Sequence, residues 1–343
     1  MEQDTPVEQV VLIGTSKGGL AALRQVLRQL PSDLDAAVFI TMHIGNHVSS
    51  LPDSLAAYTH LPVSFAETDQ PIKKNHVYVA PPDHHLLLQP GRMQLVRSAK
   101  ENHTRPAIDP MFRSAAISYG QGAAGVILTG ELDDGVVGLQ AIKAYGGLAF
   151  VQDPKTAEAS SMPESALRYV EVDFCLPLGE LGKAVAQALR DRRAGYSALH
   201  KSSRTEPFVT ENKLTYDLSA GGANALDGIG KVSGMTCPEC GGALFELGSS
   251  PLRFRCHTGH AYTSASLLGV QDEAIEEALW VAIRALHEKQ LLLESLARSS
   301  EAAGRSQAVE EYELAIRGIE QHKAALQALI TEANGSGNKL VFG

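Results

Sequence analysis

The sequence lacks the features of a membrane protein and of a secreted protein. No apolar run in its 343 residues approaches the ~20 residues that span a bilayer. The first six residues, Met-Glu-Gln-Asp-Thr-Pro, are polar and acidic, whereas a secretory signal carries a basic segment followed by an apolar one. We therefore predict a cytoplasmic protein that is not embedded in a membrane.

Basic residues and cysteines are also scarce. The chain has 30 lysines and arginines against 39 aspartates and glutamates, a net charge of −9. A general nucleic-acid-binding protein carries a basic stripe that attracts phosphates, so we expect no nucleic-acid partner. The chain has only 4 cysteines, and three of them lie between Cys237 and Cys256. Without a secretory signal, such clustering indicates metal binding rather than disulfides.

Short apolar runs alternate with helical patterns through the first half of the chain. The runs at 10–13, 36–42 and 125–129 indicate buried strands, and leucines recur at helical spacing over 20–30. This alternation predicts an α/β fold: a doubly wound, mostly parallel sheet with helices on both faces. A short hairpin is expected around Pro90 and Gly91. In such folds, ligands bind beyond the carboxyl ends of the strands.

The first strand leads into a sharp corner that presents a serine. Gly14, Ser16 and Gly18 fit the G-x-S-x-G pattern, in which a tight strand-to-helix turn exposes a nucleophilic hydroxyl. The start of the following helix offers free N–H groups for a developing oxyanion. The alternatives are a phosphate-binding turn and an ordinary tight turn. Nucleotide binding is disfavoured because neither G-x-G-x-x-G nor the Walker lysine spacing is present.

Two further polar residues follow strand ends. His43 comes directly after the second apolar run, and Asp134 follows the run at 125–129. Ser16, His43 and Asp134 therefore meet at one sheet edge as nucleophile, base and orienting acid. The alternatives are a histidine bonded to the backbone and an ordinary Asp-Gly turn. The order Ser…His…Asp differs from that of α/β-hydrolases, so we expect another hydrolase scaffold.

Several segments together resemble a known family. They are Ile13–Gly19, Met42-His43, Val77–Pro82 with His85, Arg105–Phe112, Leu128–Gly135, and Gln152–Pro154 followed by Met162-Pro163. Through these segments, residues 8–185 resemble the catalytic domain of CheB-type chemotaxis protein-glutamate methylesterases. The resemblance begins so early that we expect no N-terminal receiver domain of the usual kind, and hence another mode of activation.

The resemblance implies a serine carboxylesterase without a catalytic cofactor. Its reaction would hydrolyse glutamate γ-methyl esters on a methylated chemoreceptor or receptor-like protein, releasing methanol, with glutamine deamidation as a further activity. It assigns the nucleophile to Ser16, the base to His43 and the acid to Asp134, which agrees with the residue-based hypothesis.

Two residues depart from the family pattern in the region expected to bind the oxyanion and substrate. Lys17, beside Gly18, replaces a usually small residue, and Glu131 replaces a usual methionine. A carboxylate beside an oxyanion would destabilise it, because both carry negative charge. If Lys17 and Glu131 form an ion pair, the lysine balances the charge of the glutamate, and the two departures are explained together. The alternative function is a catalytically weak signalling module that binds its partner through the C-terminal part.

The second half of the chain predicts a linker over 194–233 and a zinc-ribbon-like module over 234–264. Cys237 and Cys240 form a Cys-x2-Cys knuckle, and a second Cys/His pair follows. We expect Cys237, Cys240, Cys256 and His260 to bind a structural Zn²⁺, with His257 as the alternative fourth ligand. The competing interpretation is a pair of turns with free thiols.

The remaining residues predict a helical hairpin over 265–333 and a flexible tail over 334–343. Apolar residues recur at heptad-like spacing over 274–297 and 307–333. These helices either pack only on each other or form a homo-oligomer or receptor-docking surface. With the catalytic domain at 1–193, the chain is expected to hold three folded parts.

Overall fold

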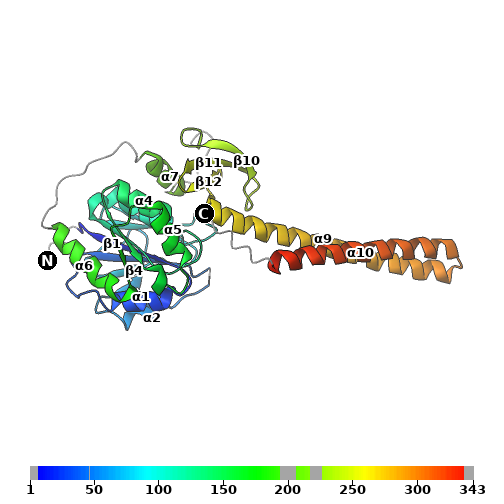
Figure 1. The fold of residues 1–343 in the computed structure, drawn as a ribbon, viewed down its shortest axis with the longest axis horizontal. Coiled ribbons are helices and arrows are strands. Elements are labelled where there is room, and N and C mark those ends of the chain that lie inside the picture. Colours follow the sequence, from blue (N-terminus) through cyan, green and yellow to red (C-terminus); the bar gives the residue numbers. More distant parts are fainter. Residues whose placement is uncertain (1–6, 46, 194–205, 217–225, 336–343) are drawn as a thin grey trace. The chain divides into compact units, whose positions relative to one another are not determined.

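The computed structural model describes residues 7–45, 47–193, 206–216 and 226–335 (Figure 1). The chain divides into two compact units, one ending at Leu267 and the other beginning at Leu268. The predicted division of the first unit into catalytic domain, linker and metal module remains a prediction.

A seven-stranded parallel sheet forms the centre of the first unit. Its strands are β1 (Val10–Thr15), β2 (Ala37–Met42), β3 (Val63–Phe65), β4 (Val77–Val79), β7 (Ala123–Ile127), β8 (Leu148–Gln152) and β9 (Phe174–Leu176), in the order β3-β4-β2-β1-β7-β8-β9. The central strand β1 pairs with β2 and β7, so Val10 lies opposite Ala37 and Ala123. All six residues of β1 are buried, as expected for a parallel strand covered on both faces.

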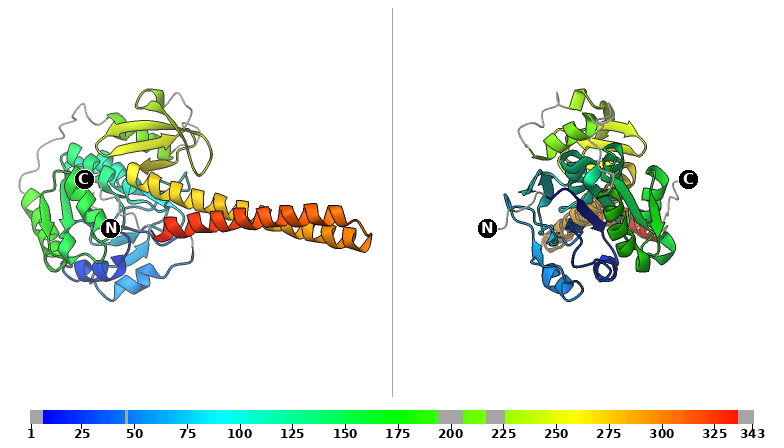
Figure 2. Two further views of the ribbon diagram at one scale, coloured as in Figure 1. Left: turned by 45° about the vertical axis from the view of Figure 1, so that its right-hand side comes forward. Right: turned by 90° about the vertical axis from the view of Figure 1, so that its left-hand side faces the viewer.

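Helices cover both faces of this sheet, which confirms the predicted α/β class (Figures 1 and 2). One face packs against α1 (Gly19–Leu27), α2 (Leu51–Ala56) and α6 (Leu178–Arg193), and the other against α3 (Ile108–Tyr119), α4 (Val136–Ala144) and α5 (Ser161–Tyr169). Val11 and Ile13 belong to the first core, whereas Val10 and Leu12 belong to the second.

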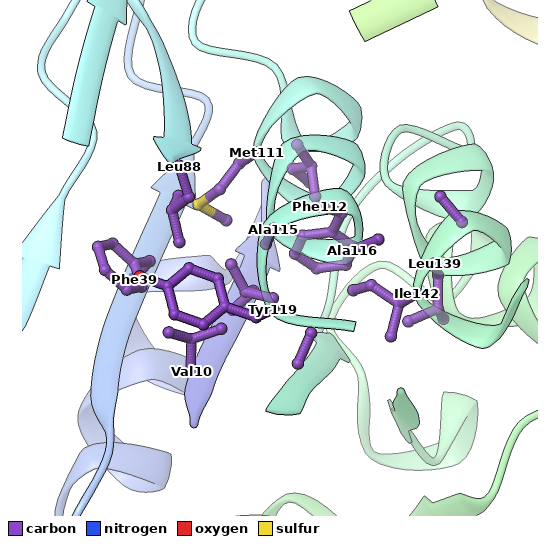
Figure 3. Close-up of a cluster of buried hydrophobic side chains, with 14 of the residues drawn as sticks. Val10, Phe39, Leu88, Met111, Phe112, Ala115, Ala116, Tyr119, Leu139 and Ile142 are labelled. Atoms are coloured by element: carbon purple, nitrogen blue, oxygen red, sulfur yellow. The ribbon is translucent and has the colours of Figure 1, made fainter. Parts of the chain in front are cut away.

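Figure 3 shows the second core, where side chains of α3 and α4 meet the sheet. Tyr119 of α3 lies beside Val10 and Phe39 of the sheet, whereas Phe112 lies toward Leu139 and Ile142 of α4. Burial of each such side chain is worth ~1.5–3 kcal/mol. The packing therefore fixes the strand ends to which the site residues are attached.

A two-stranded antiparallel hairpin, β5 (His85–Gln89) and β6 (Arg92–Val96), packs through β5 against α3. Gly91 in its turn has φ +74°, a conformation that glycine adopts without strain. The predicted hairpin is confirmed. Two short 3₁₀ turns, η1 (Gly120–Gly122) and η2 (Pro154–Thr156), complete this part of the fold.

A separate four-stranded antiparallel sheet and its turns carry three of the four cysteines. Its strands are β10 (Lys231–Thr236), β11 (Ala243–Ser249), β12 (Leu252–Cys256) and β13 (Ala261–Thr263). We call residues 231–263 the Cys/His module. Helix α7 (Glu206–Tyr216) packs against α3.

Within the predicted linker over 194–233, the structure has the helix α7 and the start of β10. Helix α7 escaped prediction because its buried residues include Glu211 and Thr215, which interrupt any apolar stripe. Residues 194–205 and 217–225 of that range lie outside the described residues.

The second unit is a helical hairpin formed by α9 (Ser264–Ala302), which begins in the first unit, and α10 (Ser306–Gly335). Gly304 turns the chain with φ +70°, and Lys323 Nζ donates across the hairpin to Gln290 Oε1 at 3.2 Å. Both helices extend beyond their predicted ends, and α10 includes the first two residues of the predicted tail. Residues 336–343 of that tail lie outside the described residues. Within the described chain, no helix combines the length and apolar content needed to cross a membrane.

Candidate active site and metal centre

Three neighbouring loops bring Ser16, His43 and Asp134 together at the carboxyl edge of the parallel sheet. Ser16 follows β1, His43 follows β2, and Asp134 lies between β7 and α4. His43 Nδ1 lies 3.1 Å from Ser16 Oγ, and His43 Nε2 lies 2.8 Å from Asp134 Oδ2. The side chain of His43 is 21% exposed and that of Asp134 only 3%. The site is therefore open to substrate at the serine and closed around the acid.

The buried carboxylate of Asp134 is saturated with hydrogen-bond donors. Its Oδ2 accepts from His43 and from the Ile108 N–H at 2.7 Å. Its Oδ1 accepts from Asn102 Nδ2 at 2.9 Å and from the Asp109 N–H at 3.2 Å. Burial opposes ionisation, but the donors outweigh it and lower the pKa of Asp134 below its ordinary value.

The ionised carboxylate of Asp134 determines which ring nitrogen of His43 carries the proton. Because a carboxylate only accepts hydrogen bonds, His43 carries its proton on Nε2. Nδ1 then offers a lone pair to the Ser16 hydroxyl. This is the arrangement needed for general-base activation of a serine, with the two ring nitrogens exchanged relative to serine proteases.

The backbone of the serine corner is held by neighbouring loops. The Ser16 N–H donates to Thr129 O at 3.0 Å, and the Thr129 hydroxyl donates to Lys17 O at 2.9 Å. Gly18 has φ +75°, and a Cβ there would lie 2.7 Å from the side chain of Glu158. Glycine is thus required both by conformation and by space.

Lys17 and Glu131 form the ion pair that would compensate the two departures. Lys17 Nζ lies 2.6 Å from Glu131 Oε1, and the side chains are 59% and 60% exposed. The hydrogen bond to Glu131, together with its charge, raises the pKa of Lys17. Glu158 adds a smaller effect in the same direction. The charge of the Glu131 carboxylate is therefore balanced by that of Lys17.

Asn102 and Asp109 were not anticipated as parts of this site. Asn102 donates through Nδ2 to both Asp134 and Asp109, the latter at 2.9 Å. Burial, and then the charge of Asp134, raise the pKa of Asp109 well above its ordinary value. The one feature of the sequence that could have pointed to them is that they flank the Arg105-Pro106 segment. A buried carboxylate needs donors for both oxygens, and such a segment can supply them.

Cys237, Cys240, Cys256 and His260 form the predicted cluster in the Cys/His module. Their ligand atoms all lie within 4.8 Å of one another. Cys240 Sγ lies 3.7 Å from Cys256 Sγ, and His260 Nδ1 lies 3.7 Å from Cys237 Sγ and 3.5 Å from Cys256 Sγ. A tetrahedral zinc with ~2.3 Å Zn–S and ~2.0 Å Zn–N bonds has edges of about 3.5–3.8 Å, so the donor set fits Zn²⁺.

The surroundings of the cluster favour His260 over the alternative ligand. His260 Nε2 lies 3.4 Å from Glu239 Oε2, the kind of carboxylate partner that orients a metal-binding imidazole. His257 is exposed and lies outside the four-residue cluster. All four cysteines of the chain lie among the described residues, and none forms a disulfide.

Comparison with known proteins shows that the part of the chain that carries this site matches a known family. Residues 11–185 match the model of the CheB methylesterase family. A Leptospira interrogans protein, provisionally named protein-glutamate methylesterase/protein-glutamine glutaminase, is 37% identical over 177 residues, which cover 51% of this chain and 92% of that protein. The second protein-glutamate methylesterase/protein-glutamine glutaminase of Anaeromyxobacter dehalogenans is 37% identical over 183 residues, covering 53% of this chain and 54% of that protein.

A solved structure shows the same similarity. The crystal structure of the Thermotoga maritima CheB methylesterase catalytic domain has a TM-score of 0.51 and 32% identity, and covers 52% of this chain and 98% of that domain. Each of these matches covers about half of the chain, and the family match ends at residue 185, before α7 and the Cys/His module.

Proposed function

Because the chain belongs to the CheB methylesterase family, we propose that it is a cytoplasmic serine carboxylesterase that hydrolyses glutamate γ-methyl esters on a chemoreceptor-like protein. The products are glutamate and methanol. The observation that carries the proposal is the hydrogen-bonded series Ser16–His43–Asp134 at the open edge of the sheet. Amide hydrolysis at glutamine uses the same groups and is proposed as a second activity.

In the proposed reaction, Ser16 Oγ attacks the ester carbonyl and its proton passes to His43 Nδ1. The resulting imidazolium is stabilised by the ionised Asp134, whose four donors hold it in place. Collapse of the tetrahedral intermediate transfers that proton to the departing methoxide, so methanol leaves and an acyl-enzyme remains. Water, deprotonated by His43, then attacks the acyl-enzyme to release glutamate and regenerate Ser16.

The oxyanion of this intermediate forms beside the first turn of α1, where Gly18 precedes backbone N–H groups without intrahelical partners. A free carboxylate of Glu131 would oppose it. The ion pair with Lys17 removes most of this opposition, which supports an active enzyme rather than a weak one.

The test is methanol release from membranes that contain methylated chemoreceptors. We expect the full-length chain to release methanol and the Ser16→Ala variant to release none above the spontaneous rate. Ammonia release from unmethylated receptors measures the glutamine activity in parallel. If the unaltered chain matches Ser16→Ala in both assays, the alternative of a partner-binding module is favoured.

We also infer that the Cys/His module binds a structural Zn²⁺ through Cys237, Cys240, Cys256 and His260. The ion would cross-link the Cys237–Cys240 knuckle to the end of β12. It would take no part in the reaction. Support comes from the tetrahedral spacing of the donors and from the small apolar core of this part, which consists of Leu214, Leu226, Phe245 and Leu247.

We further propose that the α9–α10 hairpin pairs with a second copy of the chain. Leu292 is 61% exposed on α9, and Leu314 and Leu329 are 66% and 52% exposed on α10. Two helices cannot cover apolar residues on their outer sides, whereas two hairpins in a four-helix bundle can. Light scattering should give a dimer, and Leu292→Glu with Leu314→Glu a monomer. A monomeric unaltered chain would contradict the dimer and leave receptor helices as the candidate partner.

A further inference from the structure

The side chain of Asn102 connects the catalytic acid to the C-terminal half of the first unit. Its Nδ2 donates to Asp134 Oδ1 and to Asp109 Oδ2, both at 2.9 Å. Its Oδ1 accepts from the Thr263 N–H at 3.2 Å and from Ser266 Oγ at 3.1 Å. The full hydrogen-bonding capacity of the amide is thus divided between the esterase site and the junction of β13 with α9.

Backbone pairing holds Asn102 in the same place. The Asn102 N–H donates to Ala261 O at 2.7 Å, the Ala261 N–H donates to Lys100 O at 3.3 Å, and Glu101 forms a parallel bridge with Ala261. Residues 100–102 therefore extend the module's sheet beyond β13. Ala261 directly follows His260, so a metal ligand lies next to the residue that pairs with this segment.

A second contact reaches the neighbour of the catalytic acid. Thr263 Oγ1 donates to Asp133 Oδ1 at 2.6 Å, and both residues are buried. Thr263 thus bonds on one side to Asn102 and on the other to the loop that carries Asp134. A residue three positions after His260 therefore contacts this loop directly.

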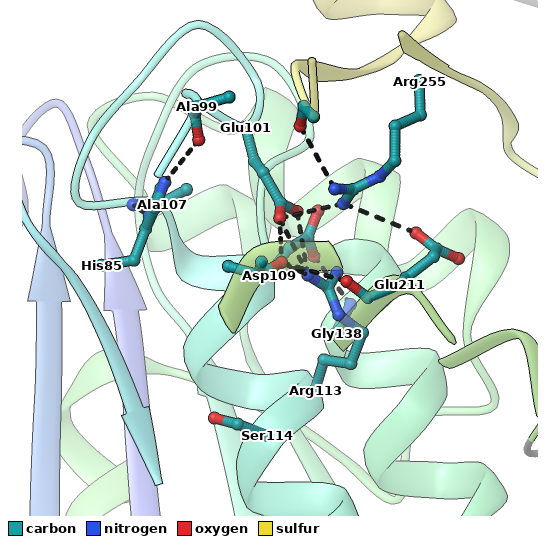
Figure 4. A network of polar contacts seen from close by, with 12 residues as sticks. His85, Ala99, Glu101, Ala107, Asp109, Arg113, Ser114, Gly138, Glu211 and Arg255 are labelled. Atoms are coloured by element: carbon teal, nitrogen blue, oxygen red, sulfur yellow. Dashed lines mark hydrogen bonds and ion pairs between the residues drawn. The ribbon is translucent and has the colours of Figure 1, made fainter. Parts of the chain in front are cut away.

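Buried charges fix the Cys/His module against α3 (Figure 4). Glu101 lies between Arg113 of α3 and Arg255 of β12, with both N···O distances at 2.9 Å and all three side chains at most 3% exposed. Burial opposes the charge of Glu101, but the two arginines lower its pKa far below the ordinary value. Loss of any partner would leave an uncompensated buried charge, which is strongly destabilising. The contact is therefore a built interface rather than an incidental one.

We propose that the Cys/His module positions the catalytic acid: Thr263 and Ser266 hold Asn102, Asn102 holds the Asp134 carboxylate at His43, and metal binding at His260 keeps β13 in register for this task. The inference rests on the proposed function in two respects, the roles of Ser16, His43 and Asp134 in catalysis and the binding of metal by His260. Asn102 acts through Asp134 and is a positioning residue.

Substitutions can test separately the hydrogen bonds that Asn102 donates to Asp134 and Asp109 and those that it accepts from Thr263 and Ser266. Asn102→Asp keeps an acceptor for Thr263 and Ser266 but replaces the donor to Asp134 with a carboxylate oxygen. Thr263→Val combined with Ser266→Ala keeps the Asn102 donor and the Thr263 N–H, but removes the Ser266 hydroxyl that donates to Asn102 and the Thr263 hydroxyl that donates to Asp133. Thr236→Val is the matched control, since Thr236 is exposed on β10 and is not among the four proposed ligands.

The decisive measurement needs no substrate. In the full-length chain labelled with ¹⁵N-histidine, the ring N–H that His43 donates to Asp134 gives a low-field proton resonance, which His43→Ala identifies. We expect this resonance to be retained in Thr236→Val. It should broaden or shift in Asn102→Asp, in the Thr263→Val/Ser266→Ala variant, and in the unaltered protein after zinc is removed by a chelator. Zinc added back should restore the last of these.

Turnover supplies a second readout. Because Asn102 touches the acid rather than the substrate, we expect kcat to fall about 10- to 100-fold in the two test variants while KM stays within about twofold. A chain that releases no methanol but shows the expected resonance changes would contradict the proposed substrate and support the positioning role. An unchanged resonance in both test variants and in the chelated protein, with each still folded by circular dichroism, would overturn the inference.

Discussion

The esterase corner and the Cys/His module hold their side chains by different means. Ser16, His43 and Asp134 sit at strand ends or in loops anchored by two large apolar cores. The apolar cluster nearest the Cys/His module is small, and its cysteines and histidine converge without such support. The strands that carry the first site are therefore held by apolar packing, whereas the second site is expected to depend on the metal ion that we propose.

Removal of the catalytic base tests whether the esterase corner folds without this polar side chain. Of the changes considered, it should have the largest effect on turnover. His43→Ala deletes the group that accepts the Ser16 proton, so we expect kcat for methanol release to fall about 10³-fold or more. His43 is partly exposed and lies outside both cores, so the thermal midpoint should stay unchanged. A large fall in the midpoint would show that the corner, like the module, needs its polar contacts to fold.

Removal of a ligand tests the other side. Cys240→Ser should weaken zinc binding by about 10²-fold or more, because each of four ligands carries roughly 3 kcal/mol of a ~10–16 kcal/mol binding free energy. Zinc content by mass spectrometry should fall below one equivalent per chain, and the thermal midpoint should fall with it. Cys175→Ser is the control, since Cys175 is exposed on β9 and outside the cluster. Equal zinc content in both variants would contradict the site.

Asp133 lies where the two regions meet and gives the comparison a pH dependence. Burial raises its pKa from 3.8 to about 6, the Asp134 charge adds to this, and the Thr263 hydroxyl partly offsets it. Between pH 3.8 and about 6, the folded protein therefore keeps a proton that the unfolded chain loses, so stability falls as the pH rises through this window.

Asp133→Asn removes that loss, because an amide stays neutral and its oxygen still accepts from Thr263. Above pH 6, the variant should be more stable than the unaltered chain by roughly 3 kcal/mol, and the difference should vanish below pH 3.8. Urea unfolding across this range measures it, with the exposed Asp53→Asn as the control. If the free energy of unfolding varies with pH in the same way for Asp133→Asn and the unaltered chain, ionisation of Asp133 does not destabilise the folded protein.

The exposed Lys17–Glu131 pair should have the smallest effect. Because water screens it, we expect Lys17→Ala to slow turnover by only about two- to fivefold, and Lys17→Ala with Glu131→Gln to restore it. Steady-state kinetics of the four members of the double-mutant cycle measure the coupling. Additive effects would mean that the pair does not act as a unit, and faster turnover in Glu131→Gln alone would show an uncompensated carboxylate.

The same contrast explains what could be predicted from the sequence. Strand periodicity and the ends of apolar runs placed Ser16 and His43 correctly, because a parallel sheet brings successive strand ends to one edge. The Cys-x2-Cys spacing likewise predicted the cluster. The sequence already favoured His260 over His257 as the fourth ligand, and the structure groups His260 with the three cysteines.

Contacts between polar residues far apart in the chain could not be predicted. Asn102 and Thr263 are 161 positions apart, and no local pattern indicates that one would accept from the other. Arg255 and Glu101 are charged residues that pattern analysis assigns to the surface, yet they neutralise each other in the interior. The predicted domain boundary at residue 193 gave no indication of this contact for the same reason.

The distance between Asn102 and Thr263 along the chain has a consequence for protein synthesis. At about 5–20 residues per second, a ribosome needs ~8–30 s to make the 161 residues that separate them. During that interval the strands that carry Ser16 and His43 are already translated, while Asn102 still lacks the partner that holds its carbonyl. Under the proposed positioning role, the nascent enzyme stays immature until β13 emerges, so truncated products of interrupted translation have reduced activity.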